Sequence, residues 1–192
     1  MQRDLLTVGA YHMSMKNSIA FDVVSRQLYS ELTNQLETYQ ISTPINADGK
    51  VTGVEVAYEQ PIGEYFGFNA NYTYANGSTA HTWSDGSHNL LGTSKNTYNV
   101  GAYFENERFG ARVSYTYRSS FLISLSGTNP YYQDDFGTLS ASLSYKATDW
   151  LSVSLDALNL NNPTYKYYQT AAIPTSFYSN GRQYYLNFRF KY

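Results

Sequence analysis

The 192-residue sequence has no cysteine, little net charge and no long apolar run. The absence of cysteine excludes a disulfide framework and thiolate metal sites. A formal net charge of -2 argues against a nucleic-acid partner, because such proteins usually carry a clustered basic face. No stretch approaches the ~18 uninterrupted apolar residues of a membrane-spanning helix. Glycine-rich phosphate loops and Ser/His/Asp arrangements are also missing, so the sequence predicts neither an enzyme nor a cofactor.

Aromatic residues, by contrast, make up 17% of the chain, with 21 Tyr and 10 Phe. So much apolar ring surface is incompatible with a disordered coil. The mean hydropathy of -0.46 resembles that of a soluble protein. Membrane strands that alternate lipid-facing and lumen-facing residues produce the same low average. The first five residues lack a basic segment followed by an apolar one, so we expect either a protein that is not exported or a chain that continues upstream.

Alternation with a period of two dominates the sequence and is clearest at its end. One face of the last segment carries Tyr184, Leu186, Phe188, Phe190 and Tyr192. The same alternation recurs over residues 54–59, 66–74, 98–105, 109–118, 139–145 and 151–157, whereas residues 5–15 alternate poorly and their faces stay unassigned. No segment keeps a helical period. The sequence therefore predicts an all-β fold of about eight antiparallel strands over residues 1–192.

The connections between these segments alternate in length. Tight turns are expected around residues 61–63, 106–108 and 148–149 because they are built from turn-forming residues. Long connections lie between them, over roughly residues 17–46, 75–96, 119–135 and 161–181. Outer-membrane barrels show this asymmetry, with short periplasmic turns and long extracellular loops. The pattern predicts transmembrane β-barrel strands with a periplasmic C-terminus.

Aromatic residues stand where a barrel would meet the two membrane surfaces. Those beside the short turns are Tyr58, Tyr65, Phe104, Phe109, Tyr145, Trp150 and Tyr192. The predicted belt on the opposite side consists of Tyr74, Tyr98, Tyr117 and Phe136. A soluble β-sandwich, the competing interpretation, is expected to have loops of similar length at both ends.

Four segments resemble the TonB-dependent receptors of Gram-negative outer membranes. They are Gly49–Glu55 before the turn at Pro61, Phe109–Arg118, Leu155–Asn162 and Gly181–Tyr185. The resemblance implies a 22-stranded barrel filled by an N-terminal plug, with a TonB box; neither plug nor box is present in these 192 residues. It implies four partners: outer-membrane lipid, the remaining barrel strands with the plug, TonB through the absent N-terminal part, and the barrel assembly machinery. The machinery would recognise the terminal segment Tyr184, Leu186, Phe188, Phe190 and Tyr192.

Two other interpretations stay open. One is a complete small eight-stranded outer-membrane barrel, whose interior is filled by its own side chains. The other is a soluble secreted β-protein that binds sugars through exposed aromatic residues. A segment of a larger barrel would leave two unpaired strand edges, which lipid does not tolerate, so we expect it to require the rest of the barrel.

Candidate ligand-binding residues gather in the long connections. Rings beside carboxylates or amides suit sugars, because ring faces cover C–H patches while polar groups bond the hydroxyls. The candidates are Trp83, Asp85, His88, Tyr131, Tyr132, Asp134, Asp135, Tyr165, Tyr167 and Tyr168. His81, Asp85 and His88 could also supply metal ligands, but nothing fixes their geometry and no metal site is predicted.

Six charged residues are predicted to face the lumen, where pairing with one another or with the plug is the expected role. They are Glu55, Glu59, Arg112, Arg118, Asp156 and Arg189. The predicted function is outer-membrane TonB-dependent active transport of a scarce nutrient. An oligosaccharide is favoured over a siderophore, because the loops are rich in Tyr and poor in Arg and Lys.

Overall fold

The computed structural model describes residues 4–126, 129–170 and 173–191, and these residues form twelve strands. The strands are β1 (Leu5–Ser30), β2 (Gln35–Ile62), β3 (Phe66–Thr79), β4 (Asn96–Glu105), β5 (Phe109–Arg118), β6 (Phe121–Ser126), β7 (Asn129–Gln133), β8 (Phe136–Lys146), β9 (Leu151–Leu158), β10 (Tyr165–Thr170), β11 (Ile173–Tyr178) and β12 (Gln183–Phe190). Within these residues, no helix has the length and apolar character needed to cross a membrane.

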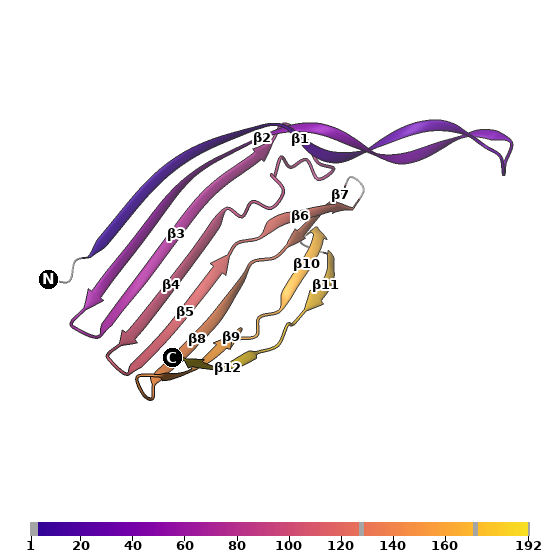
Figure 1. Cartoon of the computed structure of the whole chain (residues 1–192). Coiled ribbons are helices and arrows are strands. Elements are labelled where there is room, and N and C mark those ends of the chain that lie inside the picture. The colour runs from indigo at the N-terminus through magenta and orange to yellow at the C-terminus, as the bar shows by residue number, and fades with distance from the viewer. Residues whose placement is uncertain (1–3, 127–128, 171–172, 192) are drawn as a thin grey trace.

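Eight strands form one antiparallel sheet in the order β1-β2-β3-β4-β5-β8-β9-β12, which we call the wall sheet. The sheet curves into a trough, with β1 and β12 at its two edges (Figure 1). Residues 63–65, 106–108 and 147–150 connect strands at one end, the short-turn end. The opposite end is the long-loop end. The predicted all-β fold with eight wall strands is confirmed.

Strand register divides the wall sheet into an apolar face and a polar face. Arg112 of β5 pairs with Ser142 of β8, which in turn pairs with Asp156 of β9. One residue along, Val113 pairs with Ala141, on the other face. The register also assigns the first strand, since Leu6, Val8 and Ala10 pair with Tyr58, Val56 and Val54. These three residues therefore belong to the apolar face.

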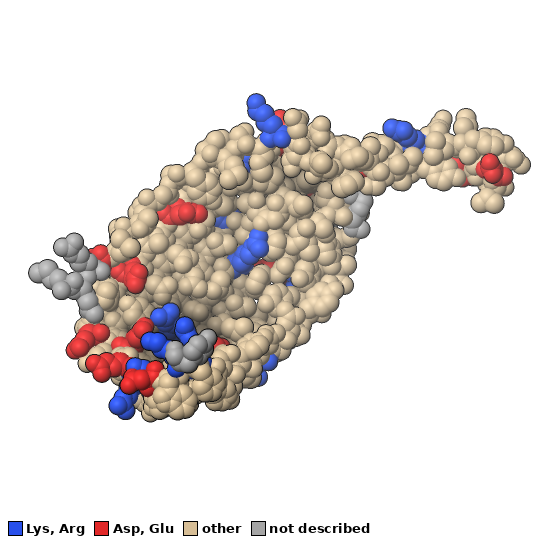
Figure 2. All heavy atoms as spheres, viewed as in Figure 1, with Lys and Arg blue, Asp and Glu red and all other residues tan. Residues whose placement is uncertain are grey.

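The polar face is the concave one. A hollow of about 680 Å³ opens on it, bounded by strands β2 to β5, β8 and β9, and we call it the wall hollow. Among its lining residues are Glu59, Asn69, Tyr103, Glu105, Arg112, Ser114, Ser140, Ser142 and Asp156. Figure 2 looks into this hollow, where isolated charged groups stand among uncharged side chains. The apolar face is thus the outward, convex side of the trough.

Aromatic rings on the outward face pack against one another at both ends. Near the short turns, Phe109 stacks on Tyr145 with ring centroids 4.7 Å apart, and Trp150 stacks on Phe190 at 6.1 Å. At the other end Tyr98 stacks on Tyr117 at 4.8 Å.

The inclusion of Phe136 in the outward belt was wrong. Phe136 pairs with Arg118 and therefore lies on the concave face, where its ring contacts Tyr165 at 4.9 Å. Tyr192, the last aromatic of the predicted set, lies outside the described residues.

The long connections contain more regular structure than the sequence predicted. β1 and β2 continue past an irregularity between Met15 and Ser18 as a two-stranded ribbon, which turns at residues 31–34. This ribbon projects far beyond the wall sheet (Figure 1). Two further hairpins, β6–β7 and β10–β11, join as a four-stranded sheet in the order β11-β10-β7-β6, the loop sheet. Residues 119–135 and 161–181 are therefore largely hairpins and not irregular loops.

Candidate functional site

Tyrosine rings stack across the loop sheet on both of its faces. β10 pairs with β7 through Tyr168 opposite Tyr132, and these two rings stack with centroids 5.5 Å apart. Tyr131 stacks on Tyr167 at 5.9 Å, and Tyr167 meets Tyr178 edge-on at 5.3 Å. The structure thus brings together four of the predicted tyrosines and adds Tyr178. Each ring fixes its neighbour, so the side chains form a pre-organised aromatic surface.

The hydroxyl of Tyr132 links the loop sheet to the β3–β4 loop. It donates to Oδ2 of Asp85 at 2.8 Å and accepts from Nδ2 of Asn89 at 3.0 Å. The Ser87 hydroxyl lies 3.1 Å away. Segments more than 40 residues apart in the sequence therefore meet at one phenol oxygen.

These contacts set the ionisation of both groups. Burial alone would raise the pKa of Asp85, but hydrogen bonds from Ser87 and Tyr132 outweigh it and lower that pKa below its ordinary value of 3.8. Burial raises the pKa of Tyr132 above 10.0, and the bond to Asp85 adds to the effect. Asp85 is thus held as a carboxylate and Tyr132 as a neutral donor, so the pair is stable across the physiological pH range.

Trp83 does not offer an exposed ring. Its side chain is buried, with 6% of its surface exposed, and its Nε1 donates to the carbonyl of Asn89 at 2.8 Å. Its ring contacts that of His81 at 4.6 Å. Trp83 therefore forms the small core of the β3–β4 loop, and its predicted role as a ring platform does not fit this burial.

The two loop histidines engage separate partners. Nε2 of His81 lies 3.8 Å from Oδ2 of Asp22 on the ribbon, whereas Nδ1 of His88 lies 3.0 Å from the backbone oxygen of His81. Asp85 faces Tyr132 instead. The described residues contain no group of three or more His, Cys, Asp or Glu side chains arranged to hold a metal ion.

Arg118 organises the junction between the wall sheet and the loops. Its guanidinium donates to the carbonyl of Gly92 at 2.6 Å and to the hydroxyl of Ser94. The same group lies over the ring of Phe121, 3.6 Å from its centroid. A planar cation with several donors can make these contacts at once. Arg118 thereby fixes the start of β6 against the β3–β4 loop.

A second hollow, of about 510 Å³, opens between the β3–β4 loop, the start of β6 and the loop sheet. We call it the loop hollow. Its lining combines amides, hydroxyls and one ammonium group with aromatic and aliphatic side chains. The residues with side chains of these kinds are Asn76, Asn89, Leu90, Thr93, Lys95, Asn96, Ser119, Ser120, Phe121, Leu122, Tyr132 and Tyr168.

The two adjacent carboxylates of the β7–β8 junction are bonded within the protein. Asp134 pairs with Lys166 at 3.1 Å, and Asp135 accepts from the Tyr117 hydroxyl at 3.1 Å. Asp134 therefore supports the loop sheet, whereas Asp135 ties the β7–β8 junction to wall strand β5. Lys166 was missed in the sequence because it stands between tyrosines in a short segment, and only the pairing of β10 with β7 brings it to Asp134.

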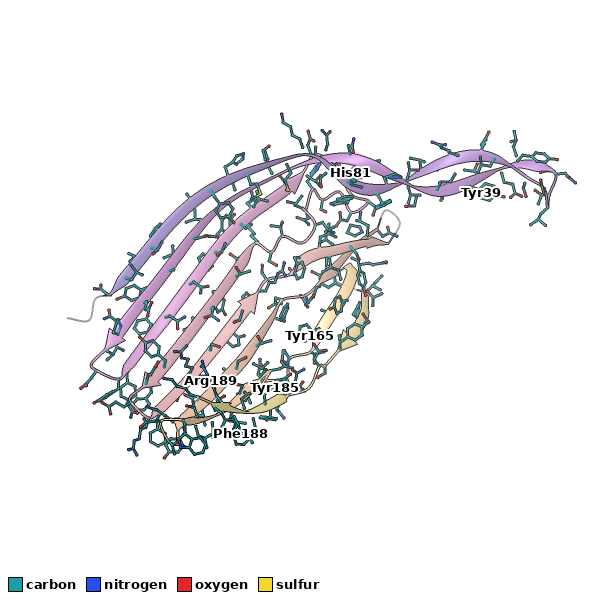
Figure 3. The ribbon with its side chains drawn as sticks, in the orientation of Figure 1. Tyr39, His81, Tyr165, Tyr185, Phe188 and Arg189 are labelled. Atoms are coloured by element: carbon teal, nitrogen blue, oxygen red, sulfur yellow. The ribbon has the colours of Figure 1, made fainter. Side chains whose placement is uncertain are left out.

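Register places all six predicted lumen residues on the concave face. Arg112 pairs with Glu105 at 3.2 Å, and Asp156 accepts from Nδ2 of Asn187 at 2.7 Å. Figure 3 shows Tyr185 and Arg189 on the inner side of β12 and Phe188 on its outer side. The remaining members of the set, Glu55, Glu59 and Arg118, share the face through their pairing with Thr73, Asn69 and Thr97.

Residues 2–162 match the family model described as "TonB dependent receptor-like, beta-barrel". This match covers more than half of the chain, so the chain belongs to that family. The family and its structural neighbours are receptors and transporters, not enzymes. A search of curated proteins by sequence gives no match.

Solved structures share the fold at low sequence identity. The copper transporter OprC aligns with a TM-score of 0.67 and 16% identity, over 98% of this chain and 29% of its own. The ferric-catecholate import receptor Fiu from E. coli K12 aligns with a TM-score of 0.60 and 18% identity, over 85% of this chain and 22% of its own. The chain therefore spans less than a third of the length of these receptors.

Proposed function

We propose that this chain supplies eight wall strands and the long loops of an outer-membrane receptor that takes up a scarce nutrient by TonB-dependent transport. The apolar convex face would contact lipid, and the concave face would line the lumen around a plug. Short turns would face the periplasm and the loop sheet the exterior. Assembly machinery would recognise the apolar face of β12, and TonB would act through the plug side of the receptor.

Membership in the receptor family carries the transport proposal. The wall sheet supports it, because an apolar outer face and a polar inner face are what lipid on one side and a filled lumen on the other require. The edges of β1 and β12 also support it, since unpaired backbone groups in lipid must be satisfied by further strands.

We further propose that the ligand is a neutral oligosaccharide held at the loop hollow. Tyr132 and Tyr168 border this hollow as a stacked pair, with Phe121 and Lys95 among the other lining residues. Rings with several amides and hydroxyls and a single ammonium group suit sugar hydroxyls and C–H faces. An anionic ferric siderophore would favour several cations.

The experiment is ligand uptake by the intact receptor in cells. Tyr168→Ala removes a ring face and is expected to reduce uptake about ten-fold, since a stacked ring contributes about 1 kcal/mol or somewhat more. Tyr168→Phe keeps the ring and is expected to retain most uptake. Surface expression is measured for both variants.

Wild-type uptake by Tyr168→Ala at normal surface level would contradict the loop-hollow proposal. Trp83→Ala is not a suitable test, because loss of this buried ring would disturb the β3–β4 loop itself. A receptor that takes up an anionic ferric complex and no sugar would reject the oligosaccharide while leaving the transport proposal intact.

A further inference from the structure

The outward face of the wall sheet changes from apolar to polar where β1, β2 and β3 approach the long-loop end. Val54 pairs with Ala10 and Tyr74. Two residues further along β2, Thr52 pairs with His12 and Asn76, and His12 Nδ1 lies 2.7 Å from the Thr52 hydroxyl. The boundary between apolar and polar surface therefore lies between these two rows.

The next row contains Ser14, Lys50 and Ser78, paired side by side across the three strands. Lys50 is exposed and faces outward. On the outward face of the eight wall strands, as far as the structure describes them and up to the irregularity after Met15, no other residue is charged. Lys50 thus stands apart from the rest of this described outward surface, and Lys16 lies just beyond it, within the irregularity of β1.

A third hollow, of about 510 Å³, opens at this row, and we call it the rim hollow. Its lining residues are Ser14, Asp48, Gly49, Lys50, Ser78, Thr79, Ala80 and His88. Lys50, with its ammonium group, and Ser14 and Ser78, with their hydroxyls, thus border the same hollow. The hollow is formed jointly by the wall strands and the β3–β4 loop.

We propose that the rim hollow binds a phosphate group on the headgroup of an outer-leaflet lipid. An ammonium group is a common phosphate ligand, and serine hydroxyls add donors to the same oxygens. Lys50 lies about 7 Å along the strand beyond Thr52, at the rise of roughly 3.3 Å per residue. This is the level of headgroups just outside the aromatic belt. The inference rests on the proposed outer-membrane placement.

A lipid is favoured over free phosphate because of where the hollow opens. Its residues Ser14, Lys50 and Ser78 belong to the outward face, and the apolar rows of Val54 and Val56 continue on that face, where acyl chains would lie. Asp48 also lines the hollow, although its Oδ1 accepts from the backbone N–H of Asn17 at 2.9 Å. Its negative charge weakens phosphate binding, so neutralising it is expected to strengthen retention.

The test is native mass spectrometry of the intact receptor in neutral detergent, with bis-phosphorylated lipid A or the same lipid without phosphates. Lys50→Gln is expected to weaken retention of the phosphorylated lipid about five-fold, since a lysine near anionic headgroups contributes roughly 1 kcal/mol. Lys50→Arg is expected to keep it, and Asp48→Asn to increase it. Lys191→Gln, the same change at the short-turn end, is the matched control and is expected to have no effect.

Two results would overturn the proposal: equal retention of the dephosphorylated lipid, or equal retention by Lys50→Gln. In the second case, Lys50-dependent binding of inorganic phosphate would show that the site binds free phosphate and not a lipid. Heat-modifiable migration on a gel confirms that each variant is folded. Sugar uptake is recorded in parallel. Reduced uptake by Tyr168→Ala together with equal lipid retention by wild type and Lys50→Gln would contradict this inference alone. Wild-type uptake by Tyr168→Ala together with weaker retention by Lys50→Gln would contradict only the loop-hollow proposal.

Discussion

The wall sheet and the loop sheet are both antiparallel, yet they distribute their side chains differently. In the wall, apolar residues such as Val113 and Leu186 occupy one face, with 45% and 61% of their surface exposed. In the loop sheet, tyrosines occupy both faces, with Tyr131 and Tyr132 on opposite sides of β7. Their hydroxyls bond to Ser176 and Asp85. One sheet separates two environments, whereas the other has the same kind of surface on each side.

This difference identifies which residues are free to carry specificity. In the proposed placement, wall residues contact lipid outside and line a polar lumen inside, so position in the strand dictates their type. Tyrosine suits a surface that packs against other side chains and also contacts water, because it has an apolar ring and a polar hydroxyl. The loop sheet, together with the loop hollow, is therefore the region in which ligand recognition is expected to reside.

The contrast between the two wall faces is expected to give the largest mutational effect. Val113→Arg places a cation on the outward face in the middle of β5 and is expected to destabilise the barrel by about 2–4 kcal/mol. Ser114→Arg makes the neighbouring change on the concave face, where it lines the wall hollow, and is expected to be tolerated. The measurement is the folded fraction of the intact receptor, determined by heat-modifiable migration. Equal folded fractions for the two variants would show that the assignment of faces is incorrect.

A smaller effect is expected where a tyrosine ring covers a glycine of the wall. A Cβ at Gly67 would collide with the ring of Tyr103, so Gly67→Ala is expected to cost about 1–3 kcal/mol. The control is Gly9→Ala, because a Cβ at Gly9 meets no atom within 4 Å. Equal unfolding midpoints in denaturant for both variants would show that the ring does not rest on Gly67.

The smallest effect is expected from pH at the junction of the two regions. Because the pKa of Asp85 is lowered, ionised Asp85 stabilises the folded junction. This stabilisation is complete above the ordinary pKa of 3.8 and is lost as pH falls through the lower pKa of the folded state. Because the pKa of Tyr132 is raised, its protonated hydroxyl also stabilises the folded junction. This stabilisation is complete below the ordinary pKa of 10.0 and is lost as pH rises through the higher pKa of the folded state. Hydrogen-exchange protection of the β3–β4 loop is therefore expected to fall at both the acidic and the alkaline end of this pH range. Asp85→Asn is expected to remove the fall at the acidic end. A fall at the acidic end that persists in Asp85→Asn would assign it to another group.

The sequence predicted the wall well because an apolar face and a polar face impose a strict period of two on each strand. It failed for the ribbon, where Ile19, Phe21 and Val23 fall on one face and Ala20 and Val24 on the other. With apolar residues on both faces there is no alternation to detect, and the segment was interpreted as a loop.

The placement of single aromatic residues was also beyond the sequence. The burial of Trp83 depends on a loop held by Tyr132, more than 40 residues away. Phe136 was assigned to the outward belt because of its type, although its spacing from Ser140 and Ser142 places it on the concave face. Local residue type is a poor guide where long-range pairing decides orientation.

The most direct test of the membrane assignment is labelling of intact cells with a membrane-impermeant maleimide, using the full receptor with one new cysteine at a time. This segment contains no cysteine of its own. Glu31→Cys lies at the turn of the ribbon and Glu107→Cys in a short turn between β4 and β5. We predict labelling of the first in intact cells and of the second only after the cells are broken. Labelling of Glu107→Cys in intact cells, with Glu31→Cys protected, would contradict the proposed orientation of the barrel wall.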